Sequence, residues 1–253
     1  MDVQNLKAVI KDRYGRIARG EVPVCCPSCG PSSKDQCLAV GYTTEDLKLV
    51  PDMAILGAGC GNPTALADLK EGETVVDLGS GAGIDVFLAA SRVGKTGRVI
   101  GVDMTADMVA RGQQLAREHG FTNVEFRQGE IEHLPLDPDA VDVIISNCVI
   151  NLTADKLASF REINRVLKPG GRILISDLVT AGTLPADVRQ SAIAWTDCLA
   201  GAMDKEAYLE TIRLAGFADV AVVAESPYEP PGMDERLQGK IISVKVRAFK
   251  GAC

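Results

Sequence analysis

The sequence predicts an α/β protein in which a parallel β-sheet is flanked by helices. Over residues 73–176, short runs rich in β-branched residues alternate with longer stretches of helical apolar spacing. This alternation is typical of a parallel sheet with helical crossovers. A glycine loop, Gly79-Ser80-Gly81-Ala82-Gly83, follows the first of these runs. A length of 253 residues fits one substantial domain, or one domain with a small annex.

The core elements are expected in a regular order along the chain. Strands are predicted at residues 74–78, 98–102, 124–127, 141–146 and 172–176. Helices are predicted at residues 84–92, 106–119 and 155–167, where apolar residues recur at helical spacing. The sequence Pro169-Gly170-Gly171 stops the last of these helices.

Two smaller parts are expected on either side of this core. Residues 1–62 begin as a helix and become rich in Cys, Pro, Ser and Gly around residues 24–36, which indicates a Cys-rich N-terminal lid. After the core, an α+β extension is expected, with helices at residues 185–202 and 205–215 and strands at residues 219–224 and 240–249. We therefore divide the chain into a lid segment, a cofactor-binding core and a C-terminal substrate-binding extension, at residues 1–62, 63–180 and 181–253.

Composition and charge limit the classes of function. A formal net charge of −7 and a pI near 5.0 would repel a phosphate backbone, so no nucleic-acid partner is expected. No apolar run approaches the ~20 residues of a membrane span, and the N-terminus lacks a secretory signal. A cytoplasmic protein with no membrane partner is therefore expected. Eight unevenly spaced cysteines in a chain of this length favour reduced thiols over disulfide staples.

The glycine loop and an acidic residue beyond it predict a site for an adenosyl cofactor. Glycines at a strand-to-helix turn let ligand atoms approach the backbone, and the following helix presents free N–H groups. Ile84 stands where the dinucleotide fingerprint requires a third glycine, which disfavours NAD. Asp103 ends the next strand about 20 residues further on, where a carboxylate accepts both ribose hydroxyls. The segment Gly129-Glu130-Ile131 follows the third strand and is placed to frame an adenine.

Three cysteines lie in contexts that differ from scattered core positions. Cys60 lies in a Gly-rich segment before the sheet, and Cys148 directly follows the fourth strand. Cys198 lies in the predicted helix after the fifth strand. Taken singly, Cys148 is explained as well by a small side chain at a crowded strand end, and Cys198 by a buried helix position, as by a functional thiol.

The sequences around these residues resemble the arsenite methyltransferases, which are class I S-adenosylmethionine-dependent methyltransferases. Residues 77–83 are similar to the first motif of that class and residues 101–104 to its second, and residues 146–152 are the most specific part of the resemblance. The resemblance implies a Rossmann-like class I methyltransferase sheet and arsenic-binding thiols at Cys60, Cys148 and Cys198. It also implies a shell of residues around the cofactor, namely Asp77, Gly79, Ser80, Gly81, Asp103, Met104, Glu130, Ile131 and Asn147.

The resemblance implies methyl transfer from S-adenosylmethionine to arsenite and methylated trivalent arsenicals, as part of arsenic detoxification. Trivalent arsenic prefers thiolate sulfur and takes three ligands, with its lone pair directed away from them. A positioned lone pair attacks the methyl group without a general base, which agrees with the presence of only His119 and His133. Thioredoxin, glutathione or another cellular thiol is the expected reductant and partner.

Two other classes of function remain as alternatives. A methyltransferase of the same fold could act on an organic acceptor such as a quinone, with the cysteines incidental. A metalloid- or zinc-binding thiol protein could sequester its ligand without methyl transfer, although the glycine loop and Asp103 argue against this.

Cys25, Cys26, Cys29 and Cys37 form a separate group near the N-terminus. The spacing of Cys26 and Cys29 suits zinc, but no matching pair follows downstream. The resemblance implies an additional thiol here that relays arsenic or pairs with Cys60, and the spacing does not say which cysteine this is. Cys253 is expected to be a frayed terminal residue.

Overall fold

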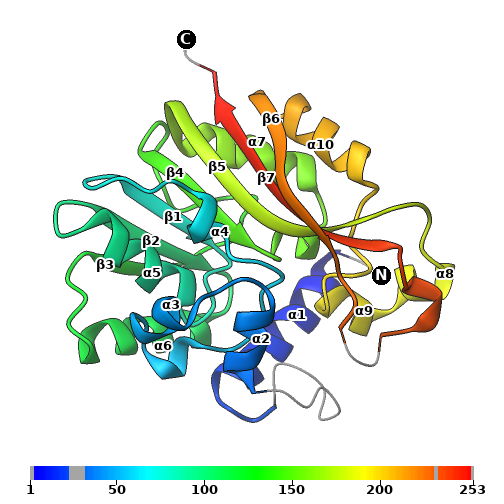
Figure 1. The fold of residues 1–253 in the computed structure, drawn as a ribbon, viewed down its shortest axis with the longest axis horizontal. Coiled ribbons are helices and arrows are strands. Elements are labelled where there is room, and N and C mark those ends of the chain that lie inside the picture. The colour runs from blue at the N-terminus through cyan, green and yellow to red at the C-terminus, as the bar shows by residue number, and fades with distance from the viewer. Residues whose placement is uncertain (1–2, 23–31, 231–232, 252–253) are drawn as a thin grey trace.

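A seven-stranded sheet forms the centre of the computed structural model, which describes residues 3–22, 32–230 and 233–251 (Figure 1). The strand order is β3-β2-β1-β4-β5-β7-β6. The first five strands are parallel, and β7 is antiparallel to both of its neighbours. Their bounds are β1 Thr74–Leu78, β2 Arg98–Asp103, β3 Val124–Gln128, β4 Val141–Asn147, β5 Leu167–Thr180, β6 Phe217–Pro227 and β7 Ile241–Lys250. The predicted α/β class is therefore confirmed.

Helices cover both faces of this sheet and create two hydrophobic cores. On one face lie α5 (Ile84–Val93) and α6 (Ala106–Glu118), and on the other lie α7 (Lys156–Val166) and α10 (Lys205–Leu214) (Figure 1). Alternate residues of the strands point into the two cores, so Val75 packs toward α5 and Val76 toward α7. Because both faces are buried, the parallel strands are the near-continuous apolar runs visible in the sequence.

The N-terminal part is helical but contributes few long elements. It contains α1 (Val3–Ala18), α2 (Ser33–Ala39), α3 (Thr44–Lys48), the 3-10 turn η2 (Asp52–Ala54) and α4 (Pro63–Leu66). Side-chain caps set the starts of three of these helices, at Ser32, Thr43 and Asn62. α1 contacts α6 and α9, below the carboxyl ends of the strands (Figure 1). Cys25, Cys26 and Cys29 lie outside the described residues, so the Cys-rich lid is not confirmed.

The single helix predicted over residues 185–202 is wrong. The chain instead forms α8 (Ala186–Gln190) and α9 (Ala192–Thr196). Ser191 separates them because its backbone is extended and its Oγ accepts a hydrogen bond from Ala194 N at 3.3 Å, as a helix cap does. Cys198 then takes a left-handed conformation with φ of 62°, so it follows α9 and does not lie within a helix.

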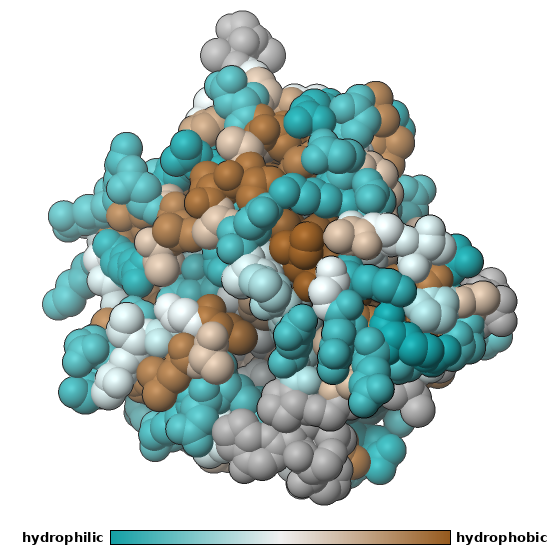
Figure 2. Space-filling model, turned by 45° about the vertical axis from the view of Figure 1, so that its right-hand side comes forward, coloured by the Kyte–Doolittle hydropathy of each residue, from teal (hydrophilic) through white to brown (hydrophobic). Residues whose placement is uncertain are grey.

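The remaining short turns are η3 (Ile150–Leu152) after β4 and η4 (Glu235–Leu237) before β7. Polar side chains are spread over the face of the molecule in Figure 2, with apolar patches between them. No helix in the described part of the chain combines the length and the apolar character that crossing a bilayer requires.

Candidate active site

The candidate site lies at the carboxyl ends of β1 and β4, where the strand order reverses. Open α/β sheets bind ligands in the crevice at such a switch point. A cavity of about 1140 Å³, partly open to solvent, occupies this crevice. Its lining contains every residue predicted for the cofactor shell, namely Asp77, Gly79, Ser80, Gly81, Asp103, Met104, Glu130, Ile131 and Asn147. The structure thus brings these side chains together around one space.

Asp103 joins the two loops that form the rim of this cavity. Its Oδ2 accepts a hydrogen bond from Gly81 N at 2.9 Å and its Oδ1 accepts one from Thr105 N at 2.8 Å. Gly81 has a φ of 52°, which favours glycine, and a Cβ at this position would meet no atom within 4 Å. The loop therefore leaves open space directly beside a fixed carboxylate.

Two further carboxyl groups lie deep in the crevice. Asp77 is the second-to-last residue of β1 and has 3% of its surface exposed. Burial together with the charges of Asp85 and Asp103 raises its pKa well above the ordinary value. Burial also raises the pKa of Asp85 to about 6, although hydrogen bonds from Tyr42 and Asn147 act in the opposite direction. Both carboxyl groups therefore hold a proton more strongly than an exposed aspartate does.

Glu130 is engaged by the N-terminal helix α1. Its two carboxylate oxygens accept hydrogen bonds from Lys7 Nζ and Lys11 Nζ, each at 2.9 Å. These bonds lower the pKa of Glu130 to about 2. Lys7 Nζ also lies 3.1 Å from Glu132. Ion pairs thus hold helix α1 across one end of the cavity. Glu130 therefore contacts two lysines and also lines the space predicted for an adenine.

These ion pairs predict the acid titration of Glu130. Because the pKa of Glu130 is lowered in the folded protein, its ion pairs stabilise the fold fully above the ordinary pKa of 4.5. This contribution to folding stability is lost as the pH falls through about 2. In a carbon NMR titration of the carboxyl group, we expect a midpoint near 2 in the parent protein. The Lys7→Met/Lys11→Met variant should return the midpoint toward 4.5. An unchanged midpoint in that variant would mean that α1 does not hold Glu130 in solution.

The three predicted arsenic thiols are buried beside this cavity. The exposed fractions of Cys60, Cys148 and Cys198 are 3%, 7% and 4%. Cys148 N and Cys60 Sγ both donate to Ser176 O, at 2.7 and 3.6 Å, and Cys198 Sγ donates to Cys148 O at 2.7 Å. Only Cys148 of the three lines the cavity itself. Cys60 therefore approaches Cys148 from the segment before β1, and Cys198 approaches it from the turn after α9.

Backbone strain is concentrated at two of these thiols. Cys148 and Cys198 have φ of 61° and 62°, a left-handed conformation that costs a side-chain-bearing residue roughly 1 to 3 kcal/mol. Such strain is retained where the surrounding structure requires it, often at functional positions. The two strained residues are in direct contact, because Cys198 Sγ donates to Cys148 O.

The electrostatic surroundings raise the pKa values of the Cys148 and Cys198 thiols. Hydrogen bonding with Cys198 and Cys60, together with burial, raises the pKa of Cys148 well above its usual range. For Cys198, the bond with Cys148 lowers the pKa, but burial and the charge of Asp177 outweigh it and the pKa is raised. Any ligand that binds these sulfurs must therefore accept or release the thiol protons.

Apolar side chains and α1 seal the thiols from water. Leu6 and Ile10 of α1 belong to the same buried cluster as the three cysteines. Arg13 Nη2 donates to Asp197 Oδ1 at 2.7 Å, and Tyr14 OH donates to Thr196 O at 3.3 Å. The helix that holds Glu130 at the cavity thus also holds the turn that carries Cys198.

Asn147 connects the cavity wall to the Cys60 segment. Its Oδ1 accepts from Cys60 N at 3.0 Å, and its Nδ2 donates to Gly61 O at 2.7 Å and to Tyr42 OH at 2.9 Å. Tyr42 OH in turn donates to Asp85. The sequence placed Asn147 in the cofactor shell alone, whereas its amide also fixes the backbone on both sides of the Cys60 side chain.

Asp177, Lys156 and Tyr208 form a buried polar group that the sequence analysis missed. Asp177 has no exposed surface, accepts from Tyr208 OH at 3.2 Å, and has its pKa raised to about 7 by burial. Lys156 lies close enough for its charge to lower that pKa, and burial lowers the pKa of Lys156 itself. Asp177 follows the apolar run of residues 173–175 in β5. The rule that selected Asp103, an acidic residue at the end of a predicted strand, also applies to Asp177, although it does not reveal that the thiols lie beside it.

Of the N-terminal cysteine group, only Cys37 lies within the described residues. It is buried in α2, lines the cavity, and has its pKa raised to about 11 by burial. The suggested zinc pair of Cys26 and Cys29 lies outside the described residues, as do Cys25 and Cys253. His133 is exposed and is absent from the cavity lining.

Comparison with known proteins defines the class first. A family model described as a methyltransferase domain matches residues 69–216, which include the five parallel strands and the glycine loop. Together with the strand order, this match identifies a class I S-adenosylmethionine-dependent methyltransferase fold.

More specific relatives narrow this class to one family. The chain is 42% identical to an arsenite methyltransferase of Halobacterium salinarum over 87% of this chain and 59% of the relative. It is 38% identical to one of Aquipseudomonas alcaligenes over 95% of this chain and 71% of the relative. A crystal structure of an arsenic(III) S-adenosylmethionine methyltransferase from Chlamydomonas reinhardtii matches with a TM-score of 0.69 and 34% identity, over 87% of this chain and 74% of that one. The chain belongs to the arsenite methyltransferase family, and it spans 59% and 71% of the length of the two relatives named first.

Proposed function

We propose that this protein transfers the methyl group of S-adenosylmethionine to trivalent arsenic held by Cys60, Cys148 and Cys198. The observation that carries the proposal is the meeting of three buried thiols, from three separate segments, at the wall of the crevice. Arsenite and methylated trivalent arsenicals are the proposed acceptors. Their conversion would serve arsenic detoxification in the cytoplasm.

The residues of the crevice fit an adenosyl cofactor. Gly81 leaves open space beside Asp103. The carboxylate accepts from Gly81 N and from the backbone and side chain of Thr105, and its remaining acceptor capacity is available to the ribose. Met104 and Ile131 supply apolar surface on the cavity wall. S-adenosylmethionine, when bound, supplies a methyl group on a positively charged sulfonium sulfur. We also propose that the chain is divided into a lid segment, a cofactor-binding core and a substrate-binding extension, with boundaries at residues 62 and 180.

Capture of arsenite proceeds by exchange of oxygen for sulfur. Each As–O bond that breaks releases water, made from the leaving hydroxyl and a thiol proton, while an As–S bond forms. Three thiols leave the arsenic lone pair on the side away from the sulfurs. The role of the protein is then to hold that lone pair in line with the methyl group, so no general base is required. Methyl transfer leaves arsenic pentavalent. A thiolate of thioredoxin, glutathione or another cellular thiol then attacks one arsenic-bound sulfur, so the electrons of that As–S bond return to arsenic and a disulfide forms. A second thiol reduces this disulfide to restore the cysteine, and exchange of the remaining As–S bonds with cellular thiols releases the methylated trivalent product.

Arsenic speciation tests this function directly. Incubation of the protein with S-adenosylmethionine, arsenite and a thiol reductant should yield methylated arsenicals and an equivalent amount of S-adenosylhomocysteine. Consumption of S-adenosylmethionine with a quinone, and none with arsenite, would favour the alternative of an organic acceptor. Absence of S-adenosylmethionine binding in calorimetry would favour a thiol protein that only sequesters its ligand.

Asp103→Ala is expected to weaken S-adenosylmethionine binding by about 1 to 3 kcal/mol, because ribose hydroxyls would lose their buried acceptor. Part of this loss comes from the loops, since Gly81 N and Thr105 N would lose their partner as well. Isothermal calorimetry measures the change. Asp107→Ala, which removes an acid of α6 paired with Arg19 at the surface, is the matched control and should leave the affinity unchanged. Equal affinities for the parent and the Asp103 variant would exclude this placement of the ribose.

A further inference from the structure

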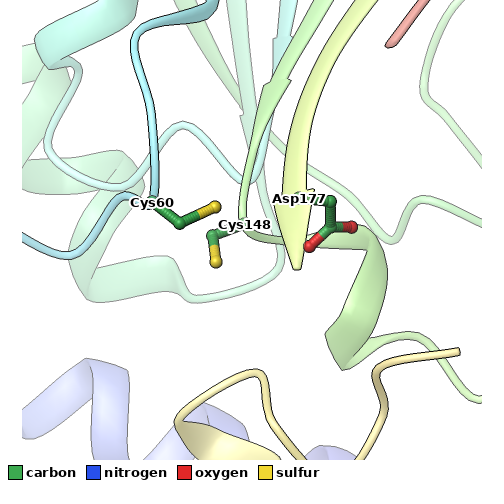
Figure 3. Close-up of side chains that lie close together, drawn as sticks. All are labelled: Cys60, Cys148 and Asp177. Atoms are coloured by element: carbon green, nitrogen blue, oxygen red, sulfur yellow. The ribbon is translucent and has the colours of Figure 1, made fainter. Parts of the chain in front are cut away.

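A carboxylate lies among the sulfurs of the proposed arsenic site. One carboxylate oxygen of Asp177 and the Sγ atoms of Cys60 and Cys148 all lie within 4.8 Å of one another. Figure 3 shows the two cysteine side chains next to each other, with Asp177 on the neighbouring strand β5. Among the described residues, no other set of three His, Cys, Asp or Glu ligand atoms is this compact. Cys198 is not part of this set, although its thiol contacts Cys148 O.

The fold keeps this carboxylate close to the thiols. Asp177 follows Ser176, whose carbonyl oxygen accepts from both Cys148 N and Cys60 Sγ. Tyr208 OH donates to Asp177 Oδ2 and Leu178 N donates to Oδ1, at 3.2 and 3.0 Å. These bonds, together with one from the Asn151 backbone, hold the side chain beside the sulfurs.

A nearby buried cation, Lys156, offsets part of the cost of burying the carboxylate. The Lys156 ammonium is also buried, with Nζ 3.4 Å from Thr153 O and 5.9 Å from the centroid of the Trp195 ring. Isolated buried charges are costly, whereas a buried pair with hydrogen bonds is tolerated. The charge of Asp177 therefore has a structural counterpart that is not itself a predicted arsenic ligand.

Methyl transfer moves the positive charge of the sulfonium sulfur to the arsenic atom, which would lie beside Asp177. The arsenic lone pair forms the As–C bond, and the electrons of the broken C–S bond return to the sulfonium sulfur, which becomes neutral. The arsenic atom, bonded to three sulfurs and now to carbon, gains the positive charge. In a dry site, a fixed charge of opposite sign lowers the energy of such a transition state more than it would in water.

We propose that Asp177 stabilises the positive charge that develops on arsenic during methyl transfer. This inference rests on the proposed function, because it requires arsenic at Cys60 and Cys148. Asp177 is not needed to capture arsenite, since the arsenic bound by three thiolates is neutral. Its effect falls on the methyl-transfer step alone.

Asp177→Asn keeps the size of the side chain and removes its charge. In single-turnover assays at pH 8, with S-adenosylmethionine and arsenite both saturating, we expect the rate to fall by about 10²-fold. Arsenite affinity should stay within about twofold of the parent, because uncharged bound arsenic gains nothing from the carboxylate. Fluorescence of Trp195, the single tryptophan and a neighbour of the thiol cluster, reports this affinity.

Tyr208→Phe is the matched control because it removes a hydrogen bond of Asp177 and keeps the carboxylate. Its rate should fall by less than about fivefold. If Asp177→Asn does not fold, as judged by S-adenosylmethionine binding, Asp177→Glu and Asp177→Gln replace it, and the charged variant should be about 10²-fold faster than the neutral one.

Three results would overturn this inference: a parent-like rate for the neutral variant, a parallel loss of arsenite affinity, or an equal loss in Tyr208→Phe. A parent protein that makes no methylated arsenic would instead overturn the proposed function. The two failures are therefore distinguishable.

Discussion

Replacing Cys148 or Cys198 by serine is expected to lower methyl transfer by at least about 10²-fold with both arsenite and trivalent monomethylarsenic. Cys148 lines the cavity, and the Cys198 thiol donates a hydrogen bond to the backbone oxygen of Cys148. Loss of either thiol leaves the acceptor free to turn, so its lone pair no longer lies in line with the methyl group, and misplacement by about 1 Å can cost 10²-fold.

Cys60→Ser should have a different effect on the two substrates. Inorganic arsenite has three positions to exchange for sulfur, whereas the monomethylated form has only two. The Cys60 variant should therefore lose activity on arsenite and keep part of its activity on trivalent monomethylarsenic. Its segment before β1 is held through Asn147 and Ser176, apart from the pair formed by Cys148 and Cys198.

Single-turnover assays of the three variants with both substrates test these expectations. Calorimetric titration with S-adenosylmethionine is the control, since serine at these positions should leave cofactor affinity intact. Parent-like rates for Cys148→Ser or Cys198→Ser would exclude the proposed pair. Equal loss on both substrates for Cys60→Ser would assign all three thiols the same role.

Most of the parallel sheet could be predicted because its strands are buried on both faces. Buried strands must be apolar along their whole length, so the runs that became β1 and β2 stood out within one residue of their bounds. β5 is longer than predicted, beginning at Leu167 and ending at Thr180. Its start at Leu167 comes from pairing with Val141 of β4. Its extension to Thr180 depends on pairing with β7, from Arg172 with Phe249 to Thr180 with Ile241, and a local pattern carries no trace of that distant partner.

The residues of the site could be predicted from the sequence, but the contacts between them could not. Cys60, Cys148 and Cys198 were selected by resemblance, and the structure brings all three to one buried cluster. Periodicity could not reveal the left-handed turn at Cys198, because a cap at Ser191 and tertiary contacts override helical spacing there. Asp177 was missed for a similar reason, since its nearness to the thiols arises only when β5 pairs with β4.

The close contact between Gly61 and β5 gives a second test of the Cys60 position. Gly61 is buried, and a Cβ there would overlap Ser176 Oγ. Its φ is not among the left-handed values of the described residues, so the obstacle to alanine is steric and not conformational. Gly61→Ala is thus expected to push the Cys60 segment away from β5, at a cost of about 1 to 3 kcal/mol in the free energy of unfolding.

The displaced Cys60 thiol should then produce the same selective defect as its removal. We expect Gly61→Ala to lose at least about 10²-fold on arsenite and to keep part of its activity on trivalent monomethylarsenic. Ser176→Gly should restore arsenite activity in the Gly61→Ala background because it removes the overlapping atoms. Ser176 Oγ is buried without a hydrogen-bond partner among the described residues, so its loss breaks no bond. Ser176→Gly alone should cost only about 0.5 to 1 kcal/mol of stability, as glycine does within a strand.

A double-mutant cycle on both substrates measures the coupling between Gly61 and Ser176. Additive losses, with no recovery in the double variant, would show that the contact between Gly61 and Ser176 does not set the position of Cys60.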